Sequence, residues 1–137
     1  MQFQKTNAPL CILDIMQNKI QSFTDLLAWK EGHVFVLDIY KKTNIFPQKE
    51  AYSLTDQMRR SAISITSNVA EGFSRRTKKD KSKFYFVALG SVTELQNQMV
   101  LARDLHYLDK ESFRSLADQS ITVAKLIRGL LKSASTY

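Results

Sequence analysis

Residues 78–105 read KKDKSKFYFVALGSVTELQNQMVLARDL, and this stretch decides the fold. Gly90 is its only helix-breaking residue. Thr77, followed three positions later by Asp80, matches the pattern that caps the N-terminus of a helix. At 1.5 Å per residue, a helix of this length extends about 42 Å, which is long for a chain of 137 residues. We therefore expect one continuous helix over the whole stretch.

Three further helices are indicated by apolar residues that recur at every third or fourth position. They cover about residues 25–42, 54–73 and 110–131. Each follows a capping residue, namely Ser22 or Thr24, then Ser53, which forms a capping-box pattern with Asp56, and Asp109. The stripes expected to be buried are Leu26, Trp29, His33, Leu37 and Tyr40 in the first, Leu54, Met58, Ala62, Ile65, Val69 and Phe73 in the second, and Phe113, Leu116, Ala117, Ile121, Ala124, Ile127 and Leu131 in the last.

Helices that are joined by short connections pack as antiparallel neighbours. The sequence therefore predicts an all-α fold, an antiparallel up-and-down four-helix bundle over residues 21–134. Residues 1–20 have no clean period and are expected to form a short N-terminal extension or an extra helix. The scarcity of Gly and Pro turn motifs argues against a β-rich fold.

The long helix is apolar on more than one face. One line contains Phe84, Ala88, Ser91, Leu95 and Ala102, while Tyr85, Phe86, Leu89, Val92 and Met99 lie off it. A helix with two apolar faces needs two partners, which are either its neighbours in the bundle or a second copy of the chain. Both alternatives stay open at this point.

Composition indicates the cellular setting. The chain has one cysteine, Cys11, so it forms no intramolecular disulfide and no cysteine-based metal site. No run approaches the ~18 consecutive apolar residues of a membrane span, and the first residues have no signal-peptide pattern. We expect a cytoplasmic protein without membrane association.

Residues suited to catalysis or metal binding are scarce. His33 and His106 are the only histidines, and neither belongs to a Glu-x-x-His pair of the kind found in di-iron bundles. Glycine-rich phosphate loops, nucleophile elbows and dinucleotide-binding motifs are absent from the sequence. His33, on an apolar stripe, is interpreted as a core residue. The sequence therefore predicts no enzyme activity and no catalytic residue, metal, cofactor or small-molecule substrate. A metal-free hydrolase or nuclease ranks third as a function, behind nucleic-acid binding and protein binding.

The net charge of +7 is concentrated in one part of the chain. Between positions 59 and 83, eight basic residues stand against Glu71 and Asp80, which gives this part a net charge of +6. The candidate nucleic-acid-binding residues are Arg59, Arg60, Arg75, Arg76, Lys78, Lys79, Lys81 and Lys83. Clustered Lys and Arg bind backbone phosphates, and the nearby Phe73 and Tyr85 suit base stacking. The alternative is that the charge keeps the bundle soluble and both aromatic residues belong to the core.

A polar line runs along the second predicted helix at Arg60, Ser64, Asn68, Glu71 and Arg75. It faces solvent, a second subunit or the long helix, where Ser91, Glu94 and Gln98 offer hydrogen-bond partners. The candidates for a polar network or an oligomer contact are Asn68, Glu71, Ser91 and Glu94.

Short motifs over residues 19–131 resemble those of one known family. They are KIQSF at 19–23, LAW at 27–29, IY at 39–40, FP at 46–47, QMRRSA at 57–62, SI at 64–65, SNVAEGF at 67–73, GS at 90–91, EL at 94–95 and LHYL at 105–108. The sequence thereby resembles the four-helix bundle proteins encoded in intervening sequences of bacterial 23S ribosomal RNA genes. The Asn-x-Ala-Glu-Gly motif near the Arg-Arg pair is fairly specific.

The resemblance implies a small bundle that assembles into a homo-oligomeric ring, a pentamer. It extends distantly to the accessory variability determinant proteins of diversity-generating retroelements, which are basic rings that look like nucleic-acid binders and partners of a reverse transcriptase. Two features depart from the family pattern. Thr66 stands where members often have Pro, which should remove a helix kink, and residues 1–18 have no counterpart.

Two functions are compatible with these observations. The first is a non-enzymatic, RNA-associated homo-oligomer that contacts phosphates and is linked to 23S rRNA intervening sequences. The alternative is a protein-interaction scaffold or accessory subunit, for example of a reverse transcriptase, without direct nucleic-acid binding. Salt distinguishes them, because phosphate contacts weaken steeply with ionic strength and apolar contacts do not.

Overall fold

The computed structural model describes residues 20–135, and every regular element in this range is helical. The elements are η1 (Phe23–Asp25), α2 (Leu27–Thr43), η2 (Gln48–Glu50), α3 (Leu54–Ser74), α4 (Lys78–Asp104) and α5 (Lys110–Ser135). Since residues 20–135 contain four long helices and no strand, the predicted all-α four-helix fold is confirmed. The predicted N-terminal extension, apart from Ile20, and Cys11 lie outside the described residues.

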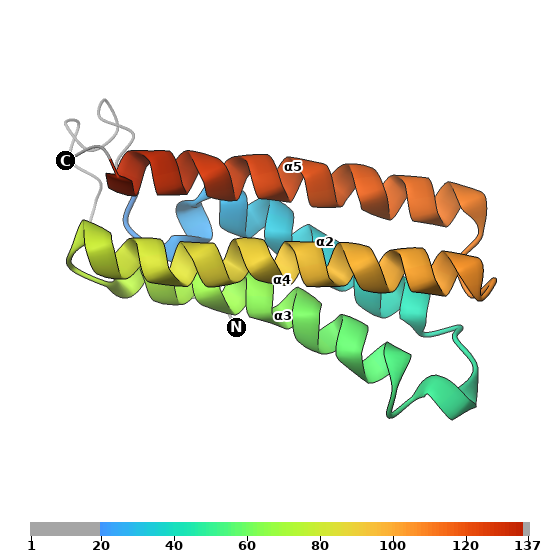
Figure 1. The fold of residues 1–137 in the computed structure, drawn as a ribbon. Coiled ribbons are helices and arrows are strands. Elements are labelled where there is room, and N and C mark those ends of the chain that lie inside the picture. The colour runs from blue at the N-terminus through green and yellow to red at the C-terminus, as the bar shows by residue number, and fades with distance from the viewer. Residues whose placement is uncertain (1–19, 136–137) are drawn as a thin grey trace, which may run out of the picture.

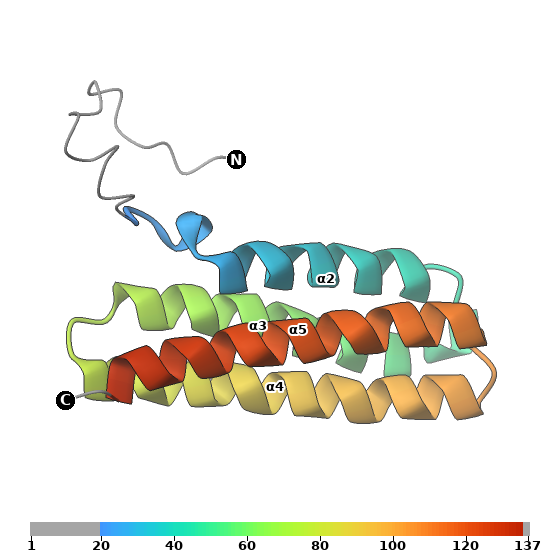
Figure 2. The same cartoon turned by 90° about the horizontal axis from the view of Figure 1, so that it is seen from above.

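The four long helices surround one core, and successive helices run antiparallel (Figure 1). α3 packs against α2 and α4, and α5 packs against α4 and α2. The α3–α4 connection lies at the same end of the bundle as the start of α2 and the last turn of α5 (Figure 2). We call this the α3–α4 end. The α2–α3 connection and the α4–α5 turn lie at the other end, which we call the α4–α5 end.

α4 has the predicted boundaries and is buried on two sides. Its first turn is capped by Thr77 Oγ1, which accepts a hydrogen bond from the backbone N–H of Asp80 at 3.1 Å. Its buried residues are Tyr85, Ala88, Ser91, Val92, Leu95, Gln98, Met99 and Ala102. The two apolar faces therefore have partners within the bundle, namely α3 and α5. Phe86 and Val87 remain 63% and 52% exposed, and an oligomer contact on that side stays a prediction.

The apolar stripe of α3 is confirmed, whereas α2 buries a different face from the predicted stripe. The buried residues of α2 are Ala28, Gly32, Phe35, Val36, Ile39 and Thr43. Leu37 and Tyr40, which were expected in the core, are exposed. A Cβ atom at Gly32 would lie 3.1 Å from Cγ2 of Thr66 on α3. The buried face thus combines large apolar residues, Phe35 and Ile39, with a glycine that lets α3 approach closely.

Two side chains near the helix ends differ from their predicted roles. His33 is exposed and stacks on Trp29 with 4.7 Å between ring centroids, so its interpretation as a core residue is wrong. Ser53 makes no capping hydrogen bond, and the predicted capping box is therefore wrong. The carboxylate of Glu50 takes that role, because its Oε2 accepts a hydrogen bond from the N–H of Leu54 at 3.3 Å.

α5 begins after the predicted cap, since Asp109 Oδ1 accepts a hydrogen bond from the N–H of Ser112 at 2.7 Å. Its predicted stripe is wrong at Ile121, which is exposed. The buried position next to it is Ser120, whose hydroxyl accepts from Gln96 Nε2 at 2.9 Å. A polar residue can occupy the core here because α4 supplies its partner, and an apolar period alone does not reveal this.

Candidate nucleic-acid interface

A three-residue connection, residues 75–77, joins α3 to α4 and leaves the two helix ends in close contact. A Cβ atom at Gly72 would lie 2.6 Å from Cε1 of Tyr85, so only glycine fits at this position. Tyr85 is only 4% exposed, and burial raises the pKa of its hydroxyl. Tyr85 therefore belongs to the core, and its ring is not available for base stacking. Phe73 is half-buried against the same core.

The amino group of Lys81 closes the C-terminal end of α3. Its Nζ donates hydrogen bonds to the carbonyl oxygens of Phe73 at 2.7 Å and Gly72 at 3.3 Å. Burial lowers the pKa of Lys81 below its ordinary value. Because the last carbonyls of a helix have no partner within the helix, a cation at this position stabilises them. Lys81 thus holds the connection in place.

The other basic residues of the connection lie on its surface. The exposed ones are Arg75, Arg76, Lys78, Lys79 and Lys83. Arg75 forms an ion pair with Glu71, and its guanidinium lies 4.6 Å from the ring centre of Phe84. Lys83 Nζ is 3.9 Å from Asp80 Oδ1. Such exposed pairs contribute little free energy, so they leave these cations able to contact a polyanion.

α5 brings two basic residues to this end that the sequence analysis did not identify. Arg128 and Lys132 lie one turn apart and line a hollow of about 260 Å³ together with Ser82 and Phe86 of α4. A second hollow, of about 280 Å³, is lined by Arg76, Lys78 and Lys81 and by Leu130 and Ser133 of α5. The antiparallel topology could have predicted the position of Arg128 and Lys132, because the last turns of α5 lie beside the start of α4.

Arg59 and Arg60 lie far from this connection. They precede Arg75 by about 22 Å along α3 at 1.5 Å per residue. Arg59 Nε donates to Thr43 Oγ1 at 3.0 Å, and its guanidinium lies 4.6 Å from the ring centre of Tyr40, so this side chain ties α3 to α2. Arg60 forms a 2.9 Å ion pair within α3. The structure thus separates the predicted basic cluster into two groups.

The charges of the described residues divide unequally between the two ends. Residues 20–35, 65–91 and 122–135 make up the half at the α3–α4 end and contain ten Lys or Arg against four Asp or Glu. Residues 36–64 and 92–121 make up the other half and contain eight of each. The whole net charge of residues 20–135 therefore lies at the α3–α4 end.

The predicted polar network forms in part between α3 and α4. The hydroxyls of Ser64 and Ser91 are 2.8 Å apart, and Asn68 Nδ2 donates to the carbonyl oxygen of Ser64 at 2.7 Å. Ser91 and Asn68 are thus joined through Ser64. Glu71 and Glu94 lie outside this network, since Glu71 pairs with an arginine of its own helix and Glu94 Oε1 accepts from Gln98 Nε2 at 3.4 Å.

Residues 20–135 contain no group of three His, Cys, Asp or Glu side chains arranged to bind a metal ion. Within the same range, no helix combines the length and the apolar character that crossing a membrane requires.

The fold and the charges define a class of protein, a small antiparallel helical bundle whose net positive charge lies at one end. A family model described as 23S rRNA-intervening sequence protein matches residues 24–129. The chain belongs to this family, which confirms the resemblance drawn from the motifs.

A solved structure has the same fold. It is a protein of unknown function from the S23 ribosomal protein family of Bacteroides thetaiotaomicron VPI-5482, with a TM-score of 0.71 and 20% sequence identity. The match covers 77% of this chain and 96% of that one. No curated protein sequence matches the chain. These comparisons do not show the distant similarity to retroelement accessory proteins.

Proposed function

We propose that this chain is a non-enzymatic, cytoplasmic, RNA-associated protein that binds phosphates at its α3–α4 end. The segregation of charge carries this proposal, because one half of the bundle holds the whole net charge and the other half holds none. Solubility requires a net charge but not its confinement to one end. A partner with many negative charges explains the confinement.

The proposed contacts come from two parts of the chain. Arg75, Arg76, Lys78, Lys79 and Lys83 surround the connection, and Arg128 and Lys132 line the adjacent hollow. Lys81 acts by holding the helix ends together. Arg59 and Arg60 lie beyond the screening length of ~8–10 Å from the connection, so we do not include them in the site. The family description refers to 23S rRNA intervening sequences, which supports RNA as the polyanion.

The test replaces Arg75, Arg76, Lys78 and Lys79 by Gln and measures binding to a single-stranded RNA with hydroxyl ends over a range of salt concentrations. Each lost phosphate contact should reduce the slope of log K against log salt by roughly 0.7, so the fourfold variant should lose up to about three units. The substituted side chains are exposed, so the fold should persist.

A matched control removes the same number of charges at the α4–α5 end. Lys41→Gln, Lys42→Gln, Lys49→Gln and Arg60→Gln should leave the slope unchanged. If both variants lose the same slope, binding follows net charge alone and the proposed site is wrong. If neither variant changes it, the connection is only a solvated loop.

The predicted homo-oligomer has its own supporting observation, a row of exposed apolar residues along α4 and at its C-cap. The row consists of Phe86, Val87, Val100, Leu101 and Leu105. We propose that this row carries the contact of a homo-oligomer, which the family resemblance suggests is a pentameric ring. Light scattering at micromolar concentration should then give a mass several times 15.7 kDa. Val87→Glu with Leu101→Glu should give a monomer, whereas Ile121→Glu on α5 should not, and a monomeric unmodified chain would contradict the contact.

A further inference from the structure

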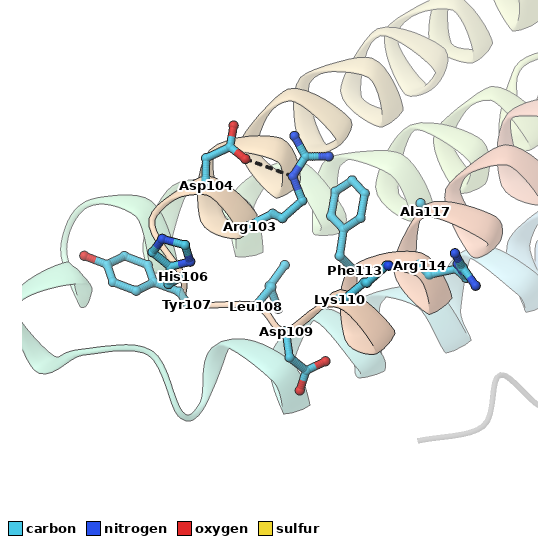
Figure 3. A pocket seen from close by; sticks show the side chains of 10 residues that line it. All are labelled: Arg103, Asp104, His106, Tyr107, Leu108, Asp109, Lys110, Phe113, Arg114 and Ala117. Carbon is cyan, nitrogen blue, oxygen red and sulfur yellow. Dashed lines mark hydrogen bonds and ion pairs between the residues drawn. The ribbon is translucent and has the colours of Figure 1, made fainter.

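A further hollow lies at the α4–α5 end, away from the basic connection. It occupies about 910 Å³, and residues on both sides of the α4–α5 turn line it (Figure 3). We call it the α4–α5 groove. Leu108 is buried among its lining residues, and Phe113 is half-buried against the core. The groove thus combines an apolar floor with a rim of charged side chains, and sites for small polar molecules place such groups around an apolar surface.

The turn that shapes the groove has a defined backbone. His106 adopts φ 64°, the left-handed conformation that ends many helices. The N–H groups of Tyr107 and Leu108 both donate to the carbonyl oxygen of Ala102, at 2.9 and 3.3 Å. These bonds turn the chain sharply and direct Leu108 into the core. Backbone hydrogen bonds in the turn therefore define the shape of the groove.

Arg103 offers a planar surface at the rim of the groove. Its guanidinium carbon lies 4.7 Å from the ring centre of Phe113, and its Nε donates to Asp104 Oδ1 at 2.9 Å (Figure 3). The guanidinium thus lies over the ring of Phe113 and is hydrogen-bonded at its edge to the carboxylate of Asp104. A guanidinium plane held in this way can stack on an aromatic base, and a carboxylate beside it can accept a hydrogen bond from an amino group of that base.

Lys110 and Arg114 also line the groove, from the first two turns of α5. Two like charges at positions i and i+4 repel each other, and cations at the start of a helix oppose its dipole. Within residues 20–135 neither side chain forms an ion pair. An anion between these two exposed side chains would reduce their mutual repulsion.

We propose that the α4–α5 groove binds a nucleoside monophosphate, either free or as a terminal nucleotide of an RNA. The base stacks on Arg103, and the phosphate lies between Lys110 and Arg114. This inference does not rest on the proposed function, because it concerns the opposite end of the bundle. A nucleotide site at the groove would be a small-molecule site that the sequence did not predict.

The experiment follows backbone amide chemical shifts of the full chain during titration with AMP. Saturable shifts should appear at residues 103–117 at AMP concentrations up to about 1 mM, the range of weak specific binding. Lys110→Gln with Arg114→Gln should weaken AMP binding roughly tenfold or more, because the charge-assisted contacts to phosphate are lost. Lys30→Gln with Lys125→Gln removes two positive charges from exposed positions outside both proposed sites and should leave AMP binding unchanged.

Melting temperature separates binding from folding. The Lys110 and Arg114 variant should melt at or above the temperature of the unmodified chain, because it removes a repulsive pair. Adenosine and inorganic phosphate should each bind more weakly than AMP. Equal binding of phosphate and AMP would overturn the base contact, and absence of saturable shifts at 103–117, or equal weakening by the control variant, would overturn the site.

Two RNA oligonucleotides distinguish the source of the nucleotide. If the groove recognises RNA ends, a short oligonucleotide with a 5′ phosphate should shift the same amides more than one with a 5′ hydroxyl. If the groove binds only the free nucleotide, AMP should displace neither oligonucleotide from the protein. If the groove does not bind AMP, the salt dependence of RNA binding at the α3–α4 end is unaffected. The two proposals can therefore be rejected independently.

Discussion

The two ends of the bundle have the same helical topology and present different surfaces. At the α3–α4 end, Gly72 allows Tyr85 to approach so closely that no further atom fits, and Lys81 closes the helix end. At the α4–α5 end, the turn leaves a hollow of about 910 Å³. The net charge lies at the α3–α4 end, and the α4–α5 end is neutral. The charged end therefore has tightly packed helix ends with two small hollows of about 260 and 280 Å³, and the neutral end has a larger one.

The α4–α5 end is held together by a polar contact between distant parts of the chain. Tyr107 donates its hydroxyl to Glu50 Oε1 at 3.1 Å. The hydrogen bonds that Glu50 accepts, chiefly from the N–H of Leu54, lower the pKa of its carboxyl. Burial and the nearby Glu50 raise the pKa of Tyr107. The ionised carboxylate of Glu50 thus stabilises this end, together with Asp109, whose pKa is lowered by the hydrogen bond from the N–H of Ser112.

The closed packing of the α3–α4 end gives the largest expected change in stability. Gly72→Ala places a Cβ 2.6 Å from the Tyr85 ring, so α3 and α4 must separate. We expect a loss of about 2–3 kcal/mol in the free energy of unfolding, measured by denaturant titration. Gly32→Ala, whose Cβ would lie 3.1 Å from a methyl group, should lose less. Equal losses would contradict the difference in packing between these contacts.

The contribution of α5 to the charged surface gives the next effect. Arg128→Gln with Lys132→Gln should reduce the salt slope of RNA binding by about 1.4, since two phosphate contacts are lost. Lys110→Gln with Arg114→Gln removes the same charges at the neutral end and should leave the slope for hydroxyl-ended RNA unchanged. A slope that changes only in the second variant would reverse the assignment of the two ends.

Acid should destabilise the α4–α5 end through Glu50. Because its pKa in the folded protein is lowered from 4.5, the stabilisation is complete above the ordinary pKa and is lost as pH falls through the folded value. Unfolding free energy should therefore decrease from about pH 5 to pH 3. Glu50→Gln and Tyr107→Phe should each flatten this dependence, as measured by thermal melts at several pH values. An unchanged dependence in both would show that other carboxylates control acid stability.

The smallest expected change in stability concerns two helical glycines, Gly90 and Gly129, where a side chain would contact no neighbouring residue. Nothing lies within 4 Å of a Cβ added at Gly90 or Gly129. Alanine at either position should raise the free energy of unfolding by about 0.5–1 kcal/mol, because alanine has the higher helix propensity. Light scattering adds a second measurement for Gly90, which is exposed on α4 near Val87. A lower mass for Gly90→Ala alone would place that side of α4 in the oligomer contact.

Local signals predicted the starts of two of the four long helices correctly, whereas the capping box expected at Ser53 does not form. Thr77 and Asp109 cap α4 and α5 as expected, because a capping side chain bonds to backbone only two or three residues away. The buried face of α2 was not predicted, although Ala28, Phe35 and Ile39 also recur at helical spacing, because two apolar stripes compete on this helix. The choice between them depends on which residues let α3 approach, and the relevant contact joins Gly32 to Thr66 across the bundle.

The candidate site was predictable only where its residues are neighbours in sequence. The cations of the α3–α4 connection were identified because they cluster between positions 75 and 83. Arg59 and Arg60 belong to the same stretch of sequence, but the length of α3 separates them from the connection. Arg128 and Lys132 lie far away in sequence, and the return of α5 brings them to it. The groove needed the geometry of the turn, which no motif indicates.

The start of α2 and the last turn of α5 lie together at the α3–α4 end (Figure 2). An affinity tag or fluorescent protein joined close to the end of α5 is therefore attached beside the charged surface and adds its own charge and bulk there. A label at an introduced cysteine in the α2–α3 connection, for example in place of Lys49, reports from the opposite end. Assays that compare the two ends should use such internal labels and a chain from which terminal tags have been removed.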